Sequence, residues 1–307
     1  MAFTAKDVQA LREMTGVGMM DCKKALTASD GDMDKAVEFL REKGLAASQK
    51  KAGRIAAEGM AYAAVIDGVG VAVEVNAETD FVGKNEKFVD FVKGVANVVA
   101  KENPSDLDDL LAKPYGNGRT VLEEQQEMVL VIGENIKVRR FARCTEGVHV
   151  PYVHAGGKIG VLVNMEVSAG LENNAEVLNA GKDAAMQIAA LNPRFLDKSQ
   201  VDQATLDEEK KIMLVQMEND PKMASKPEKV KEGIVNGKLG KFYKENCLLQ
   251  QEFVKDNSVN VEQYVTSVAK AAGGTAVIKS FVRFEKGEGI EKKQENFAEE
   301  IAKQLGK

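Results

Sequence analysis

A strand-then-helix pattern that occurs twice constrains the fold of this chain most strongly. The segment 160–167 (GVLVNMEV) echoes the segment 70–75 (GVAVEV), and each is followed by a helical pattern that ends at an Asn-Pro pair, Asn103-Pro104 or Asn192-Pro193. In the first copy, apolar residues at every second position indicate a half-buried strand. The proline of each Asn-Pro pair marks the end of the helix, because proline cannot continue a helix. The two units differ in length by one residue. A duplicated strand-helix module predicts an α+β fold with a core of two subdomains.

The two copies differ at the junction between strand and helix. The first copy has the tip Thr79-Asp80-Phe81-Val82, whereas the second has SAGL at residues 168–171. Thr79 and Asp80 can cap a helix, and Phe81 can either pack into the core or face a partner's pocket. Spacing alone favours core packing of Phe81, because phenylalanine is usually buried. The comparison of the copies instead favours a function for Phe81, because the second copy keeps the scaffold without the acidic and aromatic tip.

Composition argues against several classes of function. At 307 residues, of which 44% are hydrophobic, the chain is expected to form two or three domains with substantial cores. A net charge of −5 argues against nucleic acid as a direct partner. The apolar runs are too short to span a membrane and the N-terminus lacks the apolar core of a signal peptide, so we expect a cytoplasmic protein. Three widely separated cysteines indicate reduced thiols rather than a disulfide framework.

The sequence carries no catalytic or cofactor motif. It lacks a phosphate-binding P-loop, a dinucleotide-binding glycine motif and a nucleophile elbow, so we expect no cofactor. With only His149 and His154, and no partner at ligand spacing, we expect no metal site. His154, near a hairpin tip, could donate to a partner or be solvated, and nothing in the sequence places it beside Asp80 as an acid-base pair. Cys22 has lysines next to it that could lower its pKa, although a buried thiol is the more frequent case.

The N-terminal segment has helical signals. Residues 1–44 predict a bundle of three short helices, the third of which ends at Gly44. Met19 and Met20 follow a glycine turn, and either core packing or an adaptable docking surface suits the pair. Residues 45–59 predict a linker that could carry a helical turn or two.

The rest of the chain divides into two core subdomains and their additions. Residues 60–144 predict a first subdomain, in which two strands meet at Asp67-Gly68, a dipeptide suited to a tight hairpin. Residues 145–285 predict the second subdomain, with an antiparallel helical hairpin inserted at 197–245, and residues 286–307 predict a C-terminal helical module. The apolar stripes of the hairpin helices are Leu206, Met213 and Met217 on the first, and Val230, Ile234 or Val235, Leu239 and Phe242 on the second.

Several motifs, taken in order along the chain, resemble those of the bacterial elongation factor Ts family. They are LRE at residues 11–13, TGVGMMDCKKAL at 15–26, TDFV at 79–82, IGEN at 132–135 and FEKGEG at 284–289. The match spans essentially the whole chain, and the N-terminal pattern is close to diagnostic. The resemblance implies a translation elongation factor that acts as a guanine-nucleotide exchange factor for elongation factor Tu and performs no covalent chemistry.

The resemblance also implies an architecture and a set of contacts. It implies a ubiquitin-associated-like N-terminal bundle, a core of two subdomains, a helical coiled-coil hairpin and a C-terminal helical module. In this family the tip from Thr79 to Val82 enters the GTPase near its magnesium site, with Asp80 and Phe81 at the point of the wedge. The residues that match the family's other contacts to the GTPase are Arg12, Met19, Met20, Lys23 and His154. A homodimer within a heterotetramer is a further possibility, and the hairpin could contact either the GTPase or a second copy.

Two other classes of function remain open from the residues alone. A helical-bundle adaptor or chaperone cofactor would use the N-terminal bundle and the hairpin and would not depend on Phe81. A thiol or acid-base enzyme would use Cys22, Asp80 or His154, and the isolated protein would show a turnover that depends on pH. No motif in the sequence supports the second class.

Overall fold

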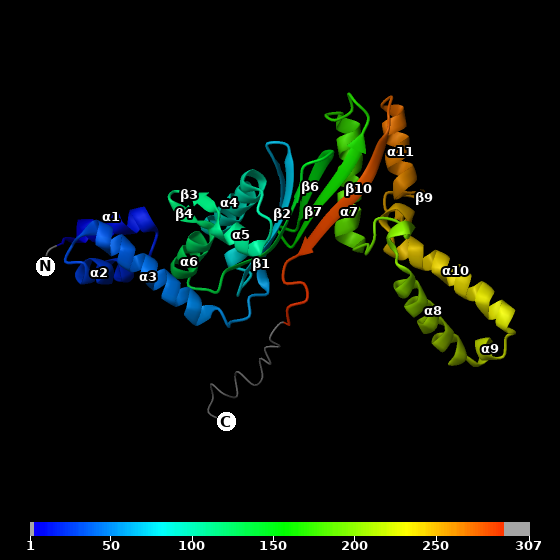
Figure 1. Cartoon of the computed structure of the whole chain (residues 1–307), viewed down its shortest axis with the longest axis horizontal. Helices are drawn as coiled ribbons and strands as arrows, with labels where there is room; N and C mark the ends of the chain where they lie inside the picture. The colour runs from blue at the N-terminus through cyan, green and yellow to red at the C-terminus, as the bar shows by residue number, and fades with distance from the viewer. Residues whose placement is uncertain (1–2, 292–307) are drawn as a thin grey trace.

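The computed structural model describes residues 3–291 and has a mixed α+β architecture, which confirms the predicted fold class (Figure 1). The N-terminal helices lie at one end of an elongated molecule, the sheets lie in the middle and a pair of helices lies at the other end. Most of the C-terminal helical module predicted for residues 286–307 falls outside the described residues. Within residues 3–291, no helix combines the length and the apolar character that crossing a membrane requires.

The N-terminal part contains three helices, α1 (Ala5–Thr15), α2 (Met19–Ala28) and α3 (Met33–Lys51). Their shared core contains Val8, Leu11, Val17, Cys22, Ala25, Leu26, Ala36 and Leu40. The predicted end of the third helix at Gly44 is wrong, because α3 continues to Lys51 and takes up half of the predicted linker. A Cβ on Gly44 would lie 3.4 Å from the backbone oxygen of Gln126. Gly44 therefore packs against the helix that contains Gln126 and does not end α3.

The first sheet has the antiparallel strand order β1-β2-β5, with β1 at Glu58–Ile66, β2 at Val69–Ala77 and β5 at Lys137–Cys144. The turn between β1 and β2 is at Asp67-Gly68, as predicted, and both residues have positive φ (51° and 82°), which this dipeptide tolerates. Helix α4 (Glu86–Glu102) covers the outer face of the sheet, and its buried residues pack against the odd-numbered valines of β2. The connection to β5 consists of α5 (Leu107–Ala112), β3 (Pro114–Gly116), β4 (Arg119–Thr120) and α6 (Val121–Ile132).

The second sheet has the antiparallel order β10-β7-β6, with β6 at Val148–His154, β7 at Ile159–Val167 and β10 at Ala276–Glu285. Helices α7 (Ala175–Leu191) and α11 (Val261–Ala271) pack against this sheet. Helices α4 and α7 each have 17 residues. Each begins after an asparagine cap and ends at an asparagine with left-handed backbone, Asn103 in one case and Asn192 in the other. The two predicted strand-helix units therefore have closely similar local structures.

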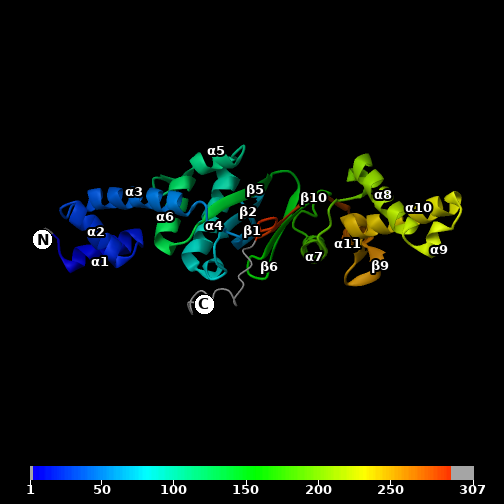
Figure 2. The same ribbon diagram turned by 90° about the horizontal axis from the view of Figure 1, so that it is seen from below.

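The two sheets face each other in the middle of the molecule, with α4 and α7 on the outer sides (Figures 1 and 2). Small side chains line the interface, where Ala63 and Ala72 pack with Leu162. A Cβ on Gly160 would lie 3.1 Å from the backbone of Ala61, so glycine is needed for this approach. The two sheets thus pack against each other through a small apolar cluster, while each has a larger core of its own on its outer face.

The predicted insertion forms a helical hairpin that projects away from the sheets (Figure 1). Its elements are α8 (Gln203–Glu218), the short α9 (Pro221–Ala224) and α10 (Glu228–Asn246), between 3-10 turns at Lys198–Gln200 and Leu248–Gln250. Strands β8 (Glu252–Phe253) and β9 (Asp256–Asn260) lead from it to α11. The predicted stripes form its core, except that Val230 is exposed. At about 100° per residue, Val230 lies about 140° around the helix from Val235, which occupies the core position.

Candidate functional site

The tip presents Phe81 to solvent between β2 and α4. The side chain of Phe81 is 79% exposed, whereas the next residue, Val82, is 5% exposed and packs into the core under α4. The expectation from spacing that Phe81 packs into the core is therefore wrong, and the alternative of a solvent-facing aromatic is confirmed. Val82 takes the core position instead, and it begins the 3-10 turn Val82–Lys84 that precedes α4.

Helix α4 begins later than the tip. Asn85 caps it, because the side-chain oxygen of Asn85 accepts hydrogen bonds from the backbone N–H groups of Lys87 (3.0 Å) and Phe88 (3.4 Å). The expected capping role of Thr79 and Asp80 is therefore wrong. Asp80 is exposed, and the hydroxyl of Thr79 donates to Oε1 of Glu134 at 2.6 Å. The tip is thus a separate turn between strand and helix, with its acidic and aromatic side chains free of the helix.

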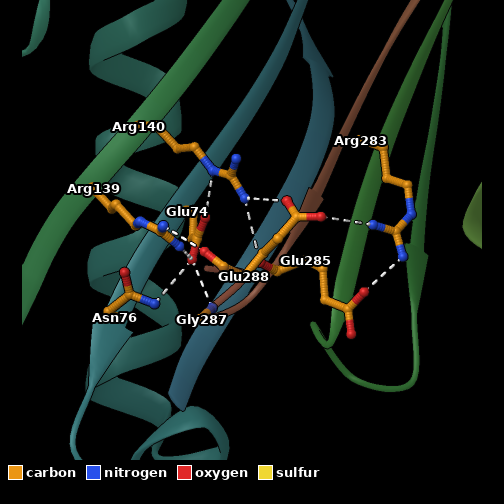
Figure 3. A network of polar contacts seen from close by, with 8 residues as sticks. All are labelled: Glu74, Asn76, Arg139, Arg140, Arg283, Glu285, Gly287 and Glu288. Carbon is orange, nitrogen blue, oxygen red and sulfur yellow. Dashed lines mark hydrogen bonds and ion pairs between the residues drawn. The ribbon is translucent and has the colours of Figure 1, made fainter. Parts of the chain in front are cut away.

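A buried carboxylate lies on β2, the strand that leads to the tip (Figure 3). Glu74 is fully buried, and its Oε1 accepts hydrogen bonds from Nδ2 of Asn76 (3.0 Å), Nη1 of Arg139 (2.9 Å) and the backbone N–H of Gly287 (2.8 Å). Its Oε2 accepts from Nε of Arg140 at 2.5 Å. Burial alone raises the pKa of Glu74, but these hydrogen bonds outweigh it, so the pKa lies below its ordinary value.

The same network reaches the segment after β10 (Figure 3). Nη2 of Arg140 donates to Oε2 of Glu288 at 3.0 Å, and Nη2 of Arg139 donates to the backbone oxygen of Glu288. Arg283 on β10 forms an ion pair with Glu285 at 2.7 Å. The FEKGEG motif at residues 284–289 therefore joins the second sheet to the first, directly behind the strand that carries the tip.

The N-terminal candidates are exposed on the helical bundle. Met19 is 50% exposed and Met20 is 65% exposed, which fits the docking alternative for the pair, and Arg12 and Lys23 are exposed as well. Arg12 and Met19 line one open cleft of about 560 Å³ between the bundle and the start of α4. Lys87 of α4 lies in the same cleft, and its Nζ donates to the backbone oxygen of Gly16 at 3.4 Å. The structure thus brings two of the four N-terminal candidates together.

His154 lies at the turn between β6 and β7 and is exposed there, as predicted. Its Nδ1 is 2.9 Å from the hydroxyl of Tyr152. The backbone oxygen of Gly157, in the same turn, accepts a hydrogen bond from the N–H of Ala61 at 2.8 Å. Near the tip, a Cβ on Gly83 would lie 2.8 Å from the backbone oxygen of Gly59. Because Gly59 and Ala61 are two residues apart on β1, the turn of His154 and the segment after Phe81 lie at the same end of this strand.

The chemistry of an enzyme finds little support in the described residues. Burial raises the pKa of the Cys22 thiol, and Cys22 lies in the core of the bundle, which confirms the expectation of a buried thiol. Cys22, Cys144 and Cys247 are all free, as predicted. In residues 3–291, no group of three or more histidine, cysteine, aspartate or glutamate side chains is arranged to hold a metal ion.

Sequence reasoning missed the residues that support the tip. Glu74, Arg139 and Arg140 carry no motif, and as residues of β2 and β5 they indicate only ordinary strand positions. The IGEN motif at residues 132–135 and the FEKGEG motif contributed to the resemblance but suggested no structural role. The one available signal was that both motifs place charged residues next to glycines.

An exposed aromatic on a strand-helix junction, together with exposed methionines on a separate bundle, is typical of a factor that binds another macromolecule. The family model described as Elongation factor TS matches residues 78–288. Proteins named Elongation factor Ts from Clostridium kluyveri (48% identical over 309 aligned positions) and Clostridium perfringens strain SM101 (49% over 308) are similar to the chain, each covering 98–99% of both sequences. A third, from Clostridium botulinum strain Eklund 17B, is 48% identical with 99% of both covered.

The chain belongs to the elongation factor Ts family. It is a translation elongation factor of the guanine-nucleotide exchange class, and it catalyses no covalent chemistry. The family resemblance seen in the sequence is confirmed.

Proposed function

We propose that this chain binds elongation factor Tu in its GDP-bound state and promotes GDP release by disturbing the magnesium and phosphate site, so that GTP can bind. The observation that carries this proposal is the tip, where Phe81 is 79% exposed beside the buried Val82. An exposed aromatic on a rigid junction can enter a partner's pocket without first losing much conformational entropy. Asp80 adds a negative charge next to it.

The energetics of exchange require no catalytic residue. A GTPase holds GDP through backbone N–H groups and a magnesium ion, so displacing either group removes much of the ligand's electrostatic anchoring. The factor must bind the nucleotide-free GTPase more tightly than the GDP-bound form. By linkage, the exchange protein lowers the affinity of the GTPase for GDP, and GDP lowers the affinity of the GTPase for the exchange protein by the same ratio.

Several separated contacts would supply the binding energy for this displacement. Arg12, Met19, Met20 and Lys23 on the bundle are exposed, which supports their proposed contact with the GTPase. His154 is exposed at the end of β1 at which the tip lies, which supports a joint contact of His154 and Phe81 near the nucleotide. Contacts at two places on one elongated body can hold the tip against the nucleotide site.

The finer architecture is part of the proposal. The helical bundle up to the end of α3 is proposed to be ubiquitin-associated-like, and the two strand-helix units are proposed to be a duplication, supported by the matching asparagine caps of α4 and α7. The proposed divisions after the linker are 60–144 and 145–285 for the core subdomains, 197–245 for the hairpin and 286–307 for the C-terminal module. A cytoplasmic location and a homodimer within a heterotetramer are proposed with them.

The test measures the release of a fluorescent GDP analogue from elongation factor Tu, with no factor, with the intact chain and with Phe81→Ala. We expect the intact chain to accelerate release strongly and Phe81→Ala to lose most of the acceleration. Because Phe81 is exposed, the variant should keep its stability within about 0.5 kcal/mol, checked by thermal unfolding.

Val65→Ala is a matched control. Val65 is 42% exposed on β1, at the end opposite to Glu58, which pairs with Ala77 beside the tip. This variant should accelerate GDP release as well as the intact chain does. If the intact, folded chain leaves the release rate unchanged, the exchange mechanism is wrong. If Phe81→Ala accelerates GDP release as well as Val65→Ala does, exchange does not depend on Phe81 and the role proposed for the tip is wrong.

A further inference from the structure

The tip is held from behind by one carboxylate. Oε2 of Glu134 accepts hydrogen bonds from the backbone N–H groups of Glu78 and Thr79, each at 3.0 Å, and Oε1 accepts one from the hydroxyl of Thr79 at 2.6 Å. These are the two residues directly before Asp80 and Phe81. A carboxylate that accepts several such bonds forms strong, charge-assisted contacts. Glu134 therefore fixes the backbone at the point where the chain leaves β2 for the tip.

Glu134 is itself held in place by its neighbours. It follows Gly133, whose left-handed backbone (φ 87°) ends α6, and it precedes Asn135, which is 7% exposed. The backbone N–H of Asn135 donates to Oε1 of Glu78 at 2.6 Å, so that the two loops bond in both directions. Nδ2 of Asn135 donates to the backbone oxygen of Arg54 at 2.8 Å. The loop after α6 is thus a fixed support for the tip.

A positive charge lies beside the two carboxylates of this support. Glu78 and Glu134 bring two carboxylates close together, which by itself is unfavourable. Nη1 of Arg54 lies 3.4 Å from Oε1 of Glu78 and supplies a positive charge. The carboxylate of Glu134 also accepts two backbone N–H groups, and that of Glu78 accepts one. Arg54 and the backbone donors therefore offset the repulsion between the two carboxylates.

The members of the tip divide into two groups. Thr79 and Val82 have inward attachments, to Glu134 and to the core under α4. Thr79 is itself exposed, and Asp80 and Phe81, between the two attachments, are exposed as well. A short turn attached on both sides can present its two middle side chains in one orientation with little loss of entropy on binding.

We propose that Glu134 is a positioning residue for nucleotide exchange, which acts through Glu78 and Thr79 to set the orientation of Asp80 and Phe81. This inference rests on the proposed function of the tip. In it, Thr79 is a support of the tip and makes no essential contact with the partner. The side chain of Glu134 itself touches neither the GTPase nor the nucleotide.

The experiment compares GDP release from elongation factor Tu in the presence of Glu134→Ala, Glu134→Gln and the intact chain. We expect Glu134→Ala to accelerate GDP release about 10-fold to 100-fold less than the intact chain, the size of effect that a misplaced contact group has. Glutamine can accept both backbone N–H groups with its oxygen and donate to the oxygen of Thr79 with its amide, so Glu134→Gln should retain most of the activity. The matched control is Glu146→Ala, an exposed glutamate after β5, at the other end of the first sheet.

Two further measurements separate positioning from a general loss of structure. Hydrogen exchange at the amides of Glu78 and Thr79 should be faster in Glu134→Ala than in the intact chain, while exchange in the strands stays unchanged. Thr79→Val should also lower the acceleration, and the double variant with Glu134→Ala should fall by less than the product of the two single effects, because both changes remove the same hydrogen bond.

Each failure has a distinct meaning. If the intact chain and Glu146→Ala do not accelerate release, the proposed function is wrong. If they do and Phe81→Ala does not, but Glu134→Ala matches the intact chain, the positioning role is overturned while the exchange function stands. Unchanged amide exchange at Glu78 and Thr79, or independent effects of Thr79→Val and Glu134→Ala, would overturn it as well.

Discussion

Replacing the buried carboxylate behind the tip should weaken the junction between the two sheets. All four groups that contact the carboxylate of Glu74 are donors: Asn76, Gly287, Arg139 and Arg140. Glutamine has the same shape, but its amide nitrogen cannot accept a hydrogen bond. In Glu74→Gln, whichever way the amide is turned, at least one donor faces another donor.

The size of the effect follows from the geometry. The less costly orientation keeps the three bonds at the position of Oε1 and loses the one from Arg140. A hydrogen bond to a charged group contributes about 1.5–3 kcal/mol, and the remaining bonds lose their charge assistance. The side chains of Arg139 and Arg140 are 27% and 32% exposed, so water replaces part of the loss. We expect the free energy of unfolding to fall by ~2–3 kcal/mol at pH 7.

The effect should depend on pH in a defined direction. The pKa of Glu74 in the folded chain is lower than the ordinary 4.5, so its charge stabilises the fold fully above about pH 4.5. This contribution is lost as the pH falls through the folded pKa, because protonated Glu74 then resembles glutamine. The difference in stability between the intact chain and Glu74→Gln should therefore shrink between pH 5 and the acid limit of the fold.

Urea unfolding followed by circular dichroism at pH 7, 5 and 4 measures this difference. Glu166→Gln is the control, because Glu166 lies on a strand of the second sheet and pairs with Lys279 at 3.1 Å but is 71% exposed. It should change the stability by less than about 1 kcal/mol at every pH. A Glu74→Gln variant as stable as the intact chain at pH 7, or one whose deficit grows as the pH falls, would refute the reasoning.

Two further predictions concern packing. Gly70→Ala should lower the stability of the core by about 1–3 kcal/mol, because its Cβ would lie 2.7 Å from Cγ of the buried His149. Urea unfolding should show a smaller loss when the same change is made in a His149→Ala background, and an equal loss would contradict the proposed clash. Met217→Ala should weaken the hairpin locally by about 2–5 kcal/mol, because Met217 is 2% exposed. Hydrogen exchange should rise in α8 and α10 but not in the sheets. The control is Ile212→Ala, because Ile212 is 44% exposed, and it should change the exchange little. A similar rise in both variants would argue against the assigned core.

Local signals were sufficient for many elements. The turn at Asp67-Gly68 follows from residues that tolerate positive φ, and the strand-helix repeat follows from apolar periodicity and the Asn-Pro pairs. These features depend on neighbours in the sequence, so the sequence alone identifies them. The family resemblance likewise depended on motifs and not on the fold.

Signals that depend on packing were misread. Glycine is a common helix end, yet Gly44 lies inside α3. It packs there against the backbone of Gln126, a contact that exists only in the folded chain. Phe81 has the spacing of a core residue, but Val82 fills that place. Glu134 lies 55 residues from Thr79 in sequence, and no local pattern relates the two.

The sequence by itself determined which residues of β2 share a face. Val71, Val73 and Val75 alternate with Ala72 and Glu74, and a period of two residues places these sets on opposite sides of the sheet. A single strand cannot show what covers each side, and a glutamate opposite a valine face is ordinarily exposed. Only the tertiary structure decided that the second sheet covers this side, so that Glu74 is buried and requires Arg139, Arg140 and the backbone of Gly287 as partners. Burial and partner choice depend on contacts between segments far apart in the chain, and the alternation of a strand carries no information about them.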